Sequence, residues 1–128
     1  MTAPLDPAAI RAHLDAFYDK VRRDPALGPV FAAAVEDWPH HMDTLAAFWG
    51  AVLLKSGGYA GNPLAAHKAL PLAPERFAAL FPVWLGLWRE TAAERFPPEV
   101  AALLTERAER IARSLEAGIL FDPARRPV

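Results

Sequence analysis

Proline residues divide this chain into helix-sized segments. Asp6-Pro7 and Asn62-Pro63 each place a capping side chain directly before a proline, which is a strong signal for the start of a helix. Trp38-Pro39, Pro74-Glu75 and Pro98-Glu99 indicate three further starts. We therefore expect helices over residues 7–23, from 39 to the glycine-rich connector 56–61, over 62–70, from 74 and from 98, with one or two helical turns at 27–31.

Apolar side chains recur within these segments at the spacing of helices, and no segment alternates in the way of a strand. The sequence therefore predicts the all-α class, with residues 1–128 as a single domain and about 122–128 as a frayed tail. The expected inward faces comprise Ile10, Leu14, Phe17, Tyr18 and Val21; His41, Leu45, Phe48, Trp49 and Val52; Phe77, Leu80, Phe81, Trp84, Leu87 and Trp88; and Val100, Leu103, Leu104, Ile111, Leu115 and Ile119.

The last two helices have one further feature each. Pro82 lies inside the segment that starts at Pro74, and a proline there conflicts with the carbonyl of Ala78, so we expect a kink or a late start. On the last helix we expect a solvated face with charge pairs one turn apart. Its members are Glu106, Arg107, Glu109, Arg110 and Arg113.

Composition excludes several classes of function. Lys and Arg total 14 against 15 Asp and Glu, so the formal net charge of −1 provides no basic surface for nucleic acid. No apolar stretch is long enough to span a membrane, and Met1–Asp6 does not resemble a secretory signal, so we expect a cytoplasmic protein. Because there is no cysteine, disulfides, thiolate ligands and thiol nucleophiles are excluded.

Four polar-capable side chains occupy the expected inward faces of four different helices. They are Tyr18, His41, His67 and Trp84. Each one alone is most simply a core residue whose polar atom is satisfied within the protein. His67, for example, shares an apolar helix face with Leu64 and Leu70, where an imidazole must find either a hydrogen bond or a metal. Four such residues on converging faces indicate a polar-lined cavity within an apolar shell.

The residue types around this expected cavity limit the kinds of metal, cofactor or catalytic group that it can hold. Zinc and di-iron sites need several carboxylate or histidine ligands at helical spacing, whereas the apolar faces carry no Asp or Glu. Ser56 and Ser114 lack the surroundings of a nucleophilic serine. Haem needs one neutral imidazole and a dry aromatic and aliphatic slot, and that requirement fits these faces.

Several segments of the chain resemble a known family, the truncated haemoglobins, and most closely its group III. The similarity extends from about Ile10 to Ile119 and implies a truncated globin fold with helices sandwiched around a haem. The segments that carry it are Phe17–Val21, Asp24–Phe31, Trp38–His41, Phe48-Trp49, Tyr59–His67 and Phe81–Leu85. A histidine at the distal position after Trp38, and the absence of a glycine pair before the Tyr18 helix, favour group III.

The resemblance implies a role for each site residue. His67 would be the proximal iron ligand, with its second ring nitrogen donating to the Pro63 carbonyl. Tyr18 and Trp84 would donate hydrogen bonds to a bound ligand, and His41 would be a gate or a weak donor. The resemblance also places Leu45 as apolar cover and Phe31 and Phe48 against the macrocycle, while His13 and His40 are expected at the surface.

The implied cofactor is haem b (iron protoporphyrin IX), and the implied ligands are oxygen, nitric oxide and carbon monoxide, with peroxide or sulfide as further candidates. A carrier must release its gas, so two donors beside the ligand favour redox chemistry or detoxification, in the manner of a nitric oxide dioxygenase or a peroxidase with a reductase partner. Two alternatives stay open at this point. One is an oxygen-binding protein without turnover that stores oxygen or delivers it to a partner, and the other is a haem-free helical interaction module.

Overall fold

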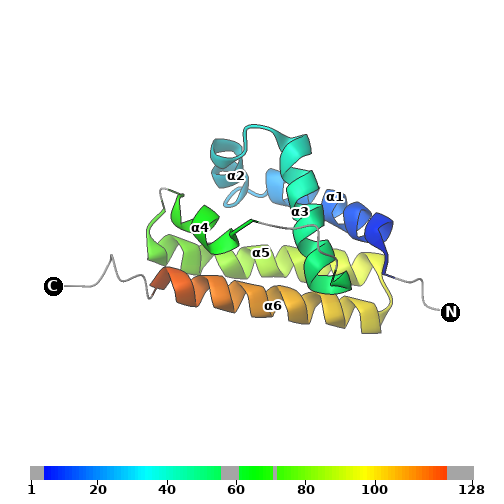
Figure 1. The fold of residues 1–128 in the computed structure, drawn as a ribbon. Helices are drawn as coiled ribbons and strands as arrows, with labels where there is room; N and C mark the ends of the chain where they lie inside the picture. The colour runs from blue at the N-terminus through cyan, green and yellow to red at the C-terminus, as the bar shows by residue number, and fades with distance from the viewer. Residues whose placement is uncertain (1–4, 56–60, 71, 121–128) are drawn as a thin grey trace.

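The computed structural model describes residues 5–55, 61–70 and 72–120, and these residues form six helices and no strand (Figure 1). The predicted all-α class is therefore confirmed. The expected connector falls largely outside the described residues, and the expected tail falls wholly outside them. The helices are α1 (Pro7–Arg23), α2 (Gly28–Ala34), α3 (Trp38–Leu54), α4 (Pro63–Lys68), α5 (Pro74–Arg95) and α6 (Pro98–Leu120).

Side-chain caps explain where α1, α3 and α4 begin. The Asp6 carboxylate accepts a hydrogen bond from the Ala9 N–H at 2.8 Å, and the Asn62 side chain accepts one from the Ala65 N–H at 3.1 Å. Both helices start at the proline that the sequence indicated. In α3 the cap is Asp37, so the helix begins at Trp38, one residue earlier than expected.

A tight turn joins α1 to α2. The Asp24 carboxylate accepts hydrogen bonds from the Ala26 and Leu27 N–H groups at 2.9 and 2.8 Å, which closes the turn. Gly28 then passes close to the end of α1, where a Cβ atom would lie 2.7 Å from the Arg22 carbonyl oxygen. Only glycine permits this approach, which brings α2 and its Phe31 side chain back towards α1.

Pro82 does not delay the start of α5. The helix begins at Pro74 and continues through Pro82 to Arg95, so the expected late start is wrong. A proline inside a helix leaves the carbonyl one turn back without its usual donor. Because Pro82 and Ala78 both lie on the exposed side of α5, that carbonyl faces water and the helix tolerates the loss.

The helices pack in two layers. The antiparallel helices α5 and α6 lie side by side, and α1 packs against both α3 and α5, so α1 and α3 cover one side of that pair (Figure 1). The centre of the core is aromatic: the rings of Trp49 on α3 and Trp88 on α5 stack with centroids 4.4 Å apart. The Trp88 indole N–H donates to the Leu104 carbonyl at 3.0 Å, which connects this stack to α6 as well.

The sequence predicts the wrong degree of burial for two side chains. His13, expected at the surface, is only 1% exposed and packs against Phe17, Trp88 and Phe96. Leu103, expected on the inner face of α6, is 39% exposed, because its neighbour Leu104 takes the buried position at 1%. Adjacent residues on a helix point about 100° apart, so only one of the two leucines can face the core.

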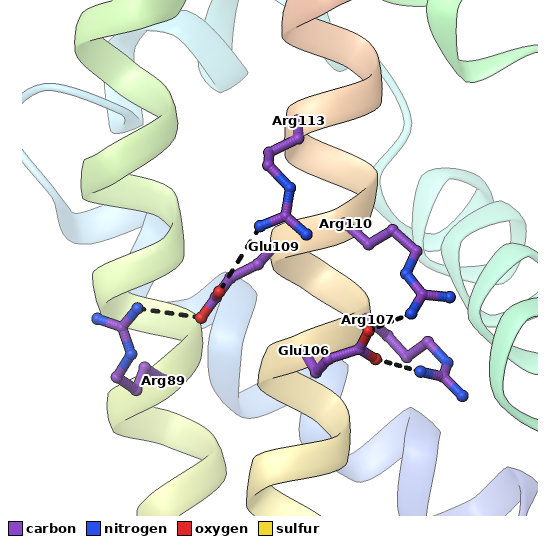
Figure 2. Close-up of polar contacts among 6 residues, drawn as sticks. All are labelled: Arg89, Glu106, Arg107, Glu109, Arg110 and Arg113. Atoms are coloured by element: carbon purple, nitrogen blue, oxygen red, sulfur yellow. Dashed lines mark hydrogen bonds and ion pairs between the residues drawn. The ribbon is translucent and has the colours of Figure 1, made fainter.

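The predicted charged face of α6 is present (Figure 2). Glu109 lies between Arg113 on the same helix, at 3.9 Å, and Arg89 on α5, at 3.4 Å. Glu106 pairs with Arg107 and Arg110. Solvent-exposed ion pairs of this kind each contribute about 0–1 kcal/mol, so the Arg89–Glu109 pair supports the contact between α5 and α6 without determining it.

Candidate functional site

A cavity of about 620 Å³ lies between the two layers, and all six helices contribute to its wall. Its volume falls in the range typical of small-molecule and cofactor sites. All seven residues that the sequence proposed for the site line this cavity: Tyr18, Phe31, His41, Leu45, Phe48, His67 and Trp84. The structure thus brings together side chains that are as many as 66 positions apart in the sequence.

His67 is held in a defined orientation on α4. Its Nδ1 atom lies 2.7 Å from the Pro63 carbonyl oxygen, one turn back in the same helix. A carbonyl can only accept, so Nδ1 carries a proton. The ring is flanked by Phe77 and Phe81, each with centroids 6.2 Å away. In the neutral ring this arrangement leaves the lone pair on Nε2, in aromatic surroundings, as a metal-binding histidine requires.

Tyr18 and His41 occupy another part of the wall. Their rings contact edge to face with centroids 6.3 Å apart, and Tyr18 also contacts Phe31 at 5.8 Å. Burial raises the pKa of the Tyr18 hydroxyl to about 12, although hydrogen bonding by the Trp84 indole acts in the opposite direction. At neutral pH Tyr18 therefore keeps its proton and can donate it in a hydrogen bond.

The orientation of Trp84 is determined by its aromatic neighbours. Its ring stacks on Trp88 at 5.4 Å and contacts Phe17 edge to face at 5.3 Å. Since Trp88 is itself anchored by its hydrogen bond to the Leu104 carbonyl, this stack fixes the plane of the Trp84 indole. The pose that the sequence left uncertain because of Pro82 is therefore set by side-chain packing within an uninterrupted helix.

His41 is half-buried, and its Nε2 atom is buried without a hydrogen-bond partner in the described parts of the chain. Burial lowers the pKa of His41, and repulsion from the neighbouring His40 lowers it further. The imidazole is therefore biased towards its neutral form. A buried polar atom without a partner costs about 1–3 kcal/mol, which a hydrogen-bonding ligand in the cavity would offset.

The mouth of the cavity contains polar residues that the sequence reasoning missed. Glu36, Asp37, His40 and Thr44 line it near the corner between α2 and α3. His40 is exposed, as expected, yet it also borders the cavity. Its position beside His41 could have indicated this, whereas Glu36 and Asp37 precede α3 and belong to no helical face. Among the described lining residues there is no lysine or arginine.

Nowhere in the described chain do three His, Asp or Glu side chains gather closely enough to hold a metal ion together. Likewise, none of the helices in the described ranges combines the length and apolarity needed to cross a membrane.

The fold and the cavity thus define a helical cofactor-binding protein with a single oriented imidazole and an aromatic, aliphatic pocket. Comparison with known proteins agrees. The chain is 35% identical over 112 residues to the group 3 truncated haemoglobin ctb of Campylobacter jejuni, covering 84% of this chain and 86% of that protein. The crystal structure of the group III truncated haemoglobin from Campylobacter jejuni superposes with a TM-score of 0.83 and 32% identity, covering 93% of this chain and 95% of that one.

No protein-family model matches the sequence. The sequence identity to these two proteins, over most of the length of each chain, shows that this chain belongs to the group III truncated haemoglobins. Membership confirms the resemblance stated from the sequence and the truncated globin fold. It also implies a haem cofactor and the binding of diatomic gas ligands.

Proposed function

We propose that this protein is a cytoplasmic haem b globin that performs redox chemistry on diatomic ligands, or detoxifies oxygen and nitrogen species, and is not a bulk oxygen carrier. The observation that carries the proposal is the pairing of an oriented His67 imidazole with hydrogen-bond donors around one apolar cavity. When bound, a ferrous haem supplies the metal that takes up the gas ligand.

The residues present fit such a cofactor. His67 would hold the iron through Nε2, because its Nδ1 proton is already engaged by the Pro63 carbonyl. Phe31, Leu45 and Phe48 line the cavity and would cover the macrocycle with apolar surface. Since the 128 residues contain no cysteine, no thioether bond to the cofactor can form, which favours a non-covalently bound haem b.

Three side chains would act on the ligand. Tyr18 keeps its hydroxyl proton at neutral pH, and the Trp84 indole N–H can only donate. His41 is biased towards the neutral form and has an unpartnered, buried Nε2 within the described structure. The apolar wall excludes water, which strengthens each of these hydrogen bonds.

The expected effect of the donors decides between transport and chemistry. If Tyr18 and Trp84 each contribute about 1–1.5 kcal/mol to a bound ligand, its release slows roughly a hundredfold. A protein that releases oxygen so slowly is poorly suited to delivery. The same donors would favour polarisation of an O–O bond, which supports peroxide or nitric oxide chemistry with electrons from a reductase.

Absorption spectroscopy tests the cofactor assignment. The purified protein, oxidised and reduced, should show a Soret band after addition of haemin, and the ferrous form should bind carbon monoxide. His67→Ala should abolish this spectrum, whereas the matched control His40→Ala should preserve it, because His40 is exposed at the cavity mouth. Failure of the wild-type protein to take up excess haemin would refute the proposal and favour a haem-free interaction module.

The rate of oxygen dissociation then tests the function. Tyr18→Phe and Trp84→Phe should each speed up release about tenfold, since each removes one donor. If the wild-type protein already releases oxygen rapidly and neither substitution changes the rate, the storage alternative is correct.

A further inference from the structure

Helix α4 has little structure of its own to hold it in place. It comprises six residues, none of them buried, and a helix this short is not stable by itself. The Asn62 cap determines where α4 begins but not where it lies in the protein. Within the described structure, the backbone of α4 approaches the backbone of α6. The α4–α6 contact therefore helps to determine where His67 sits in the cavity, together with Phe77 and Phe81 on α5.

That contact occurs at Gly118 of α6, a residue that has no side chain. A Cβ atom at Gly118 on α6 would lie 2.8 Å from both methyl carbons of Leu64 and 3.4 Å from its Cγ atom. Separations under 3.0 Å essentially never occur for real Cβ atoms, so the Leu64 methyl groups, which end a flexible side chain, would have to move to admit a side chain at position 118. Glycine weakens a helix interior relative to alanine, and here that local cost accompanies a close approach of two helices.

Leu64 is coupled directly to His67. The two residues are three positions apart and so lie on one side of α4. Leu64 also follows Pro63, whose carbonyl oxygen orients the His67 ring at 2.7 Å. A displacement of the Leu64 backbone away from α6 would therefore move both the imidazole and the carbonyl that orients it.

We propose that Gly118 is a positioning residue for the proximal histidine: by admitting Leu64 against α6, it sets the depth of α4 and the orientation of His67 in the cavity. This inference rests on the proposed role of His67 as the iron ligand. It gives Gly118 a role in the geometry of the site, although Gly118 is not among the residues that line the cavity.

The chain offers a matched control for the test. Gly86 on α5 is also a helical glycine, but a Cβ atom there would meet nothing within 4 Å. Gly118→Ala and Gly86→Ala therefore make the same chemical change with the same effect on helix propensity, and they differ in the contact with Leu64.

Three readouts on the full chain report the position of His67. In the haem-free protein, NMR of the histidine ring shows whether the Nδ1 proton stays bonded to the Pro63 carbonyl. In the ferrous haem form, resonance Raman spectroscopy measures the iron–imidazole stretching frequency. Transfer of haemin to a scavenger protein gives the rate of cofactor loss, which should rise about tenfold in Gly118→Ala, as is typical when the partners of a metal ligand are disturbed.

We expect Gly118→Ala to shift the ring proton resonance and the stretching frequency, and Gly86→Ala to leave both unchanged. In a Leu64→Ala background, where the methyl groups are gone, Gly118→Ala should have no further effect. The inference is overturned if haem binds normally and Gly118→Ala matches Gly86→Ala in all three readouts. A wild-type protein that takes up no haemin refutes the proposed function instead, and the NMR comparison still decides the positioning role.

Discussion

The replacement of His13 by leucine should make this protein more stable, and most clearly so in acid. The His13 ring is 1% exposed, and neither of its nitrogens has a hydrogen-bond partner in the described residues. Trp88 lies edge-on to it at 4.5 Å and Phe96 at 5.5 Å. A buried polar group without a partner costs about 1–3 kcal/mol. Leucine has a similar volume and no polar atom, so His13→Leu should raise the free energy of unfolding at pH 7 by about that amount.

The pH dependence gives a second, independent magnitude. Burial, followed by repulsion from Arg95 and Lys20, lowers the pKa of His13 from 6.5 to about 4. Between these two pH values the unfolded chain binds a proton at His13 that the folded protein excludes, so stability falls as pH falls. The full loss amounts to about 3 kcal/mol, complete near pH 4 and absent above pH 6.5.

Urea unfolding of the wild type and His13→Leu at matched haem content, from pH 7 to pH 4, measures both effects. The two stability curves should diverge as pH falls, because the carboxylates that titrate in this range are common to both proteins. The control His40→Leu removes an exposed imidazole and should change the free energy of unfolding by less than about 0.5 kcal/mol at pH 7. Parallel curves for His13→Leu and the wild type, or a less stable variant at pH 7, would refute this reasoning.

Two further substitutions test the helix packing. Gly28→Ala should destabilise the protein by about 1–3 kcal/mol in thermal unfolding, because its Cβ atom would lie 2.7 Å from the Arg22 carbonyl oxygen; an unchanged melting temperature would mean that the α1–α2 turn relaxes freely. Lys20 bonds Glu90 at 2.9 Å and Glu94 at 2.6 Å, so Lys20→Met should cost about 0.2–1 kcal/mol at low ionic strength. That difference should shrink in 0.5 M sodium chloride, and a salt-independent loss would indicate that the lysine acts through packing of its methylene chain.

Much of the fold was predictable because its signals are local. Asp6 and Asn62 cap the helices that follow them through bonds to residues three positions on, and a short-range interaction of this kind can be read from sequence. The one-residue error at Trp38 arose because Asp37, two residues before Pro39, does the capping. Pro82 was harder, since its cost depends on whether the freed Ala78 carbonyl meets water, and that depends on which side of α5 faces the solvent.

His13 shows where local reasoning fails. It lies three residues after Ile10 and four before Phe17, so its position on the buried face of α1 was readable. Its polarity favoured a surface assignment, because an imidazole without a partner is costly to bury. What overrides that cost is contact with Trp88 and Phe96, which come from α5 and the turn after it. Such long-range contacts leave no trace in the spacing of a single helix.

The sequence by itself determined the helices, most of the side chains that face inward and the resemblance that identifies the family, because capping, helical periodicity and residue type all act within a few residues. The tertiary structure alone decided that the Trp84 ring stacks on Trp88 and that Leu64 lies close against Gly118 of α6. These features depend on how closely whole helices approach one another. That distance is the joint result of all the packed side chains and cannot be assigned to any one segment.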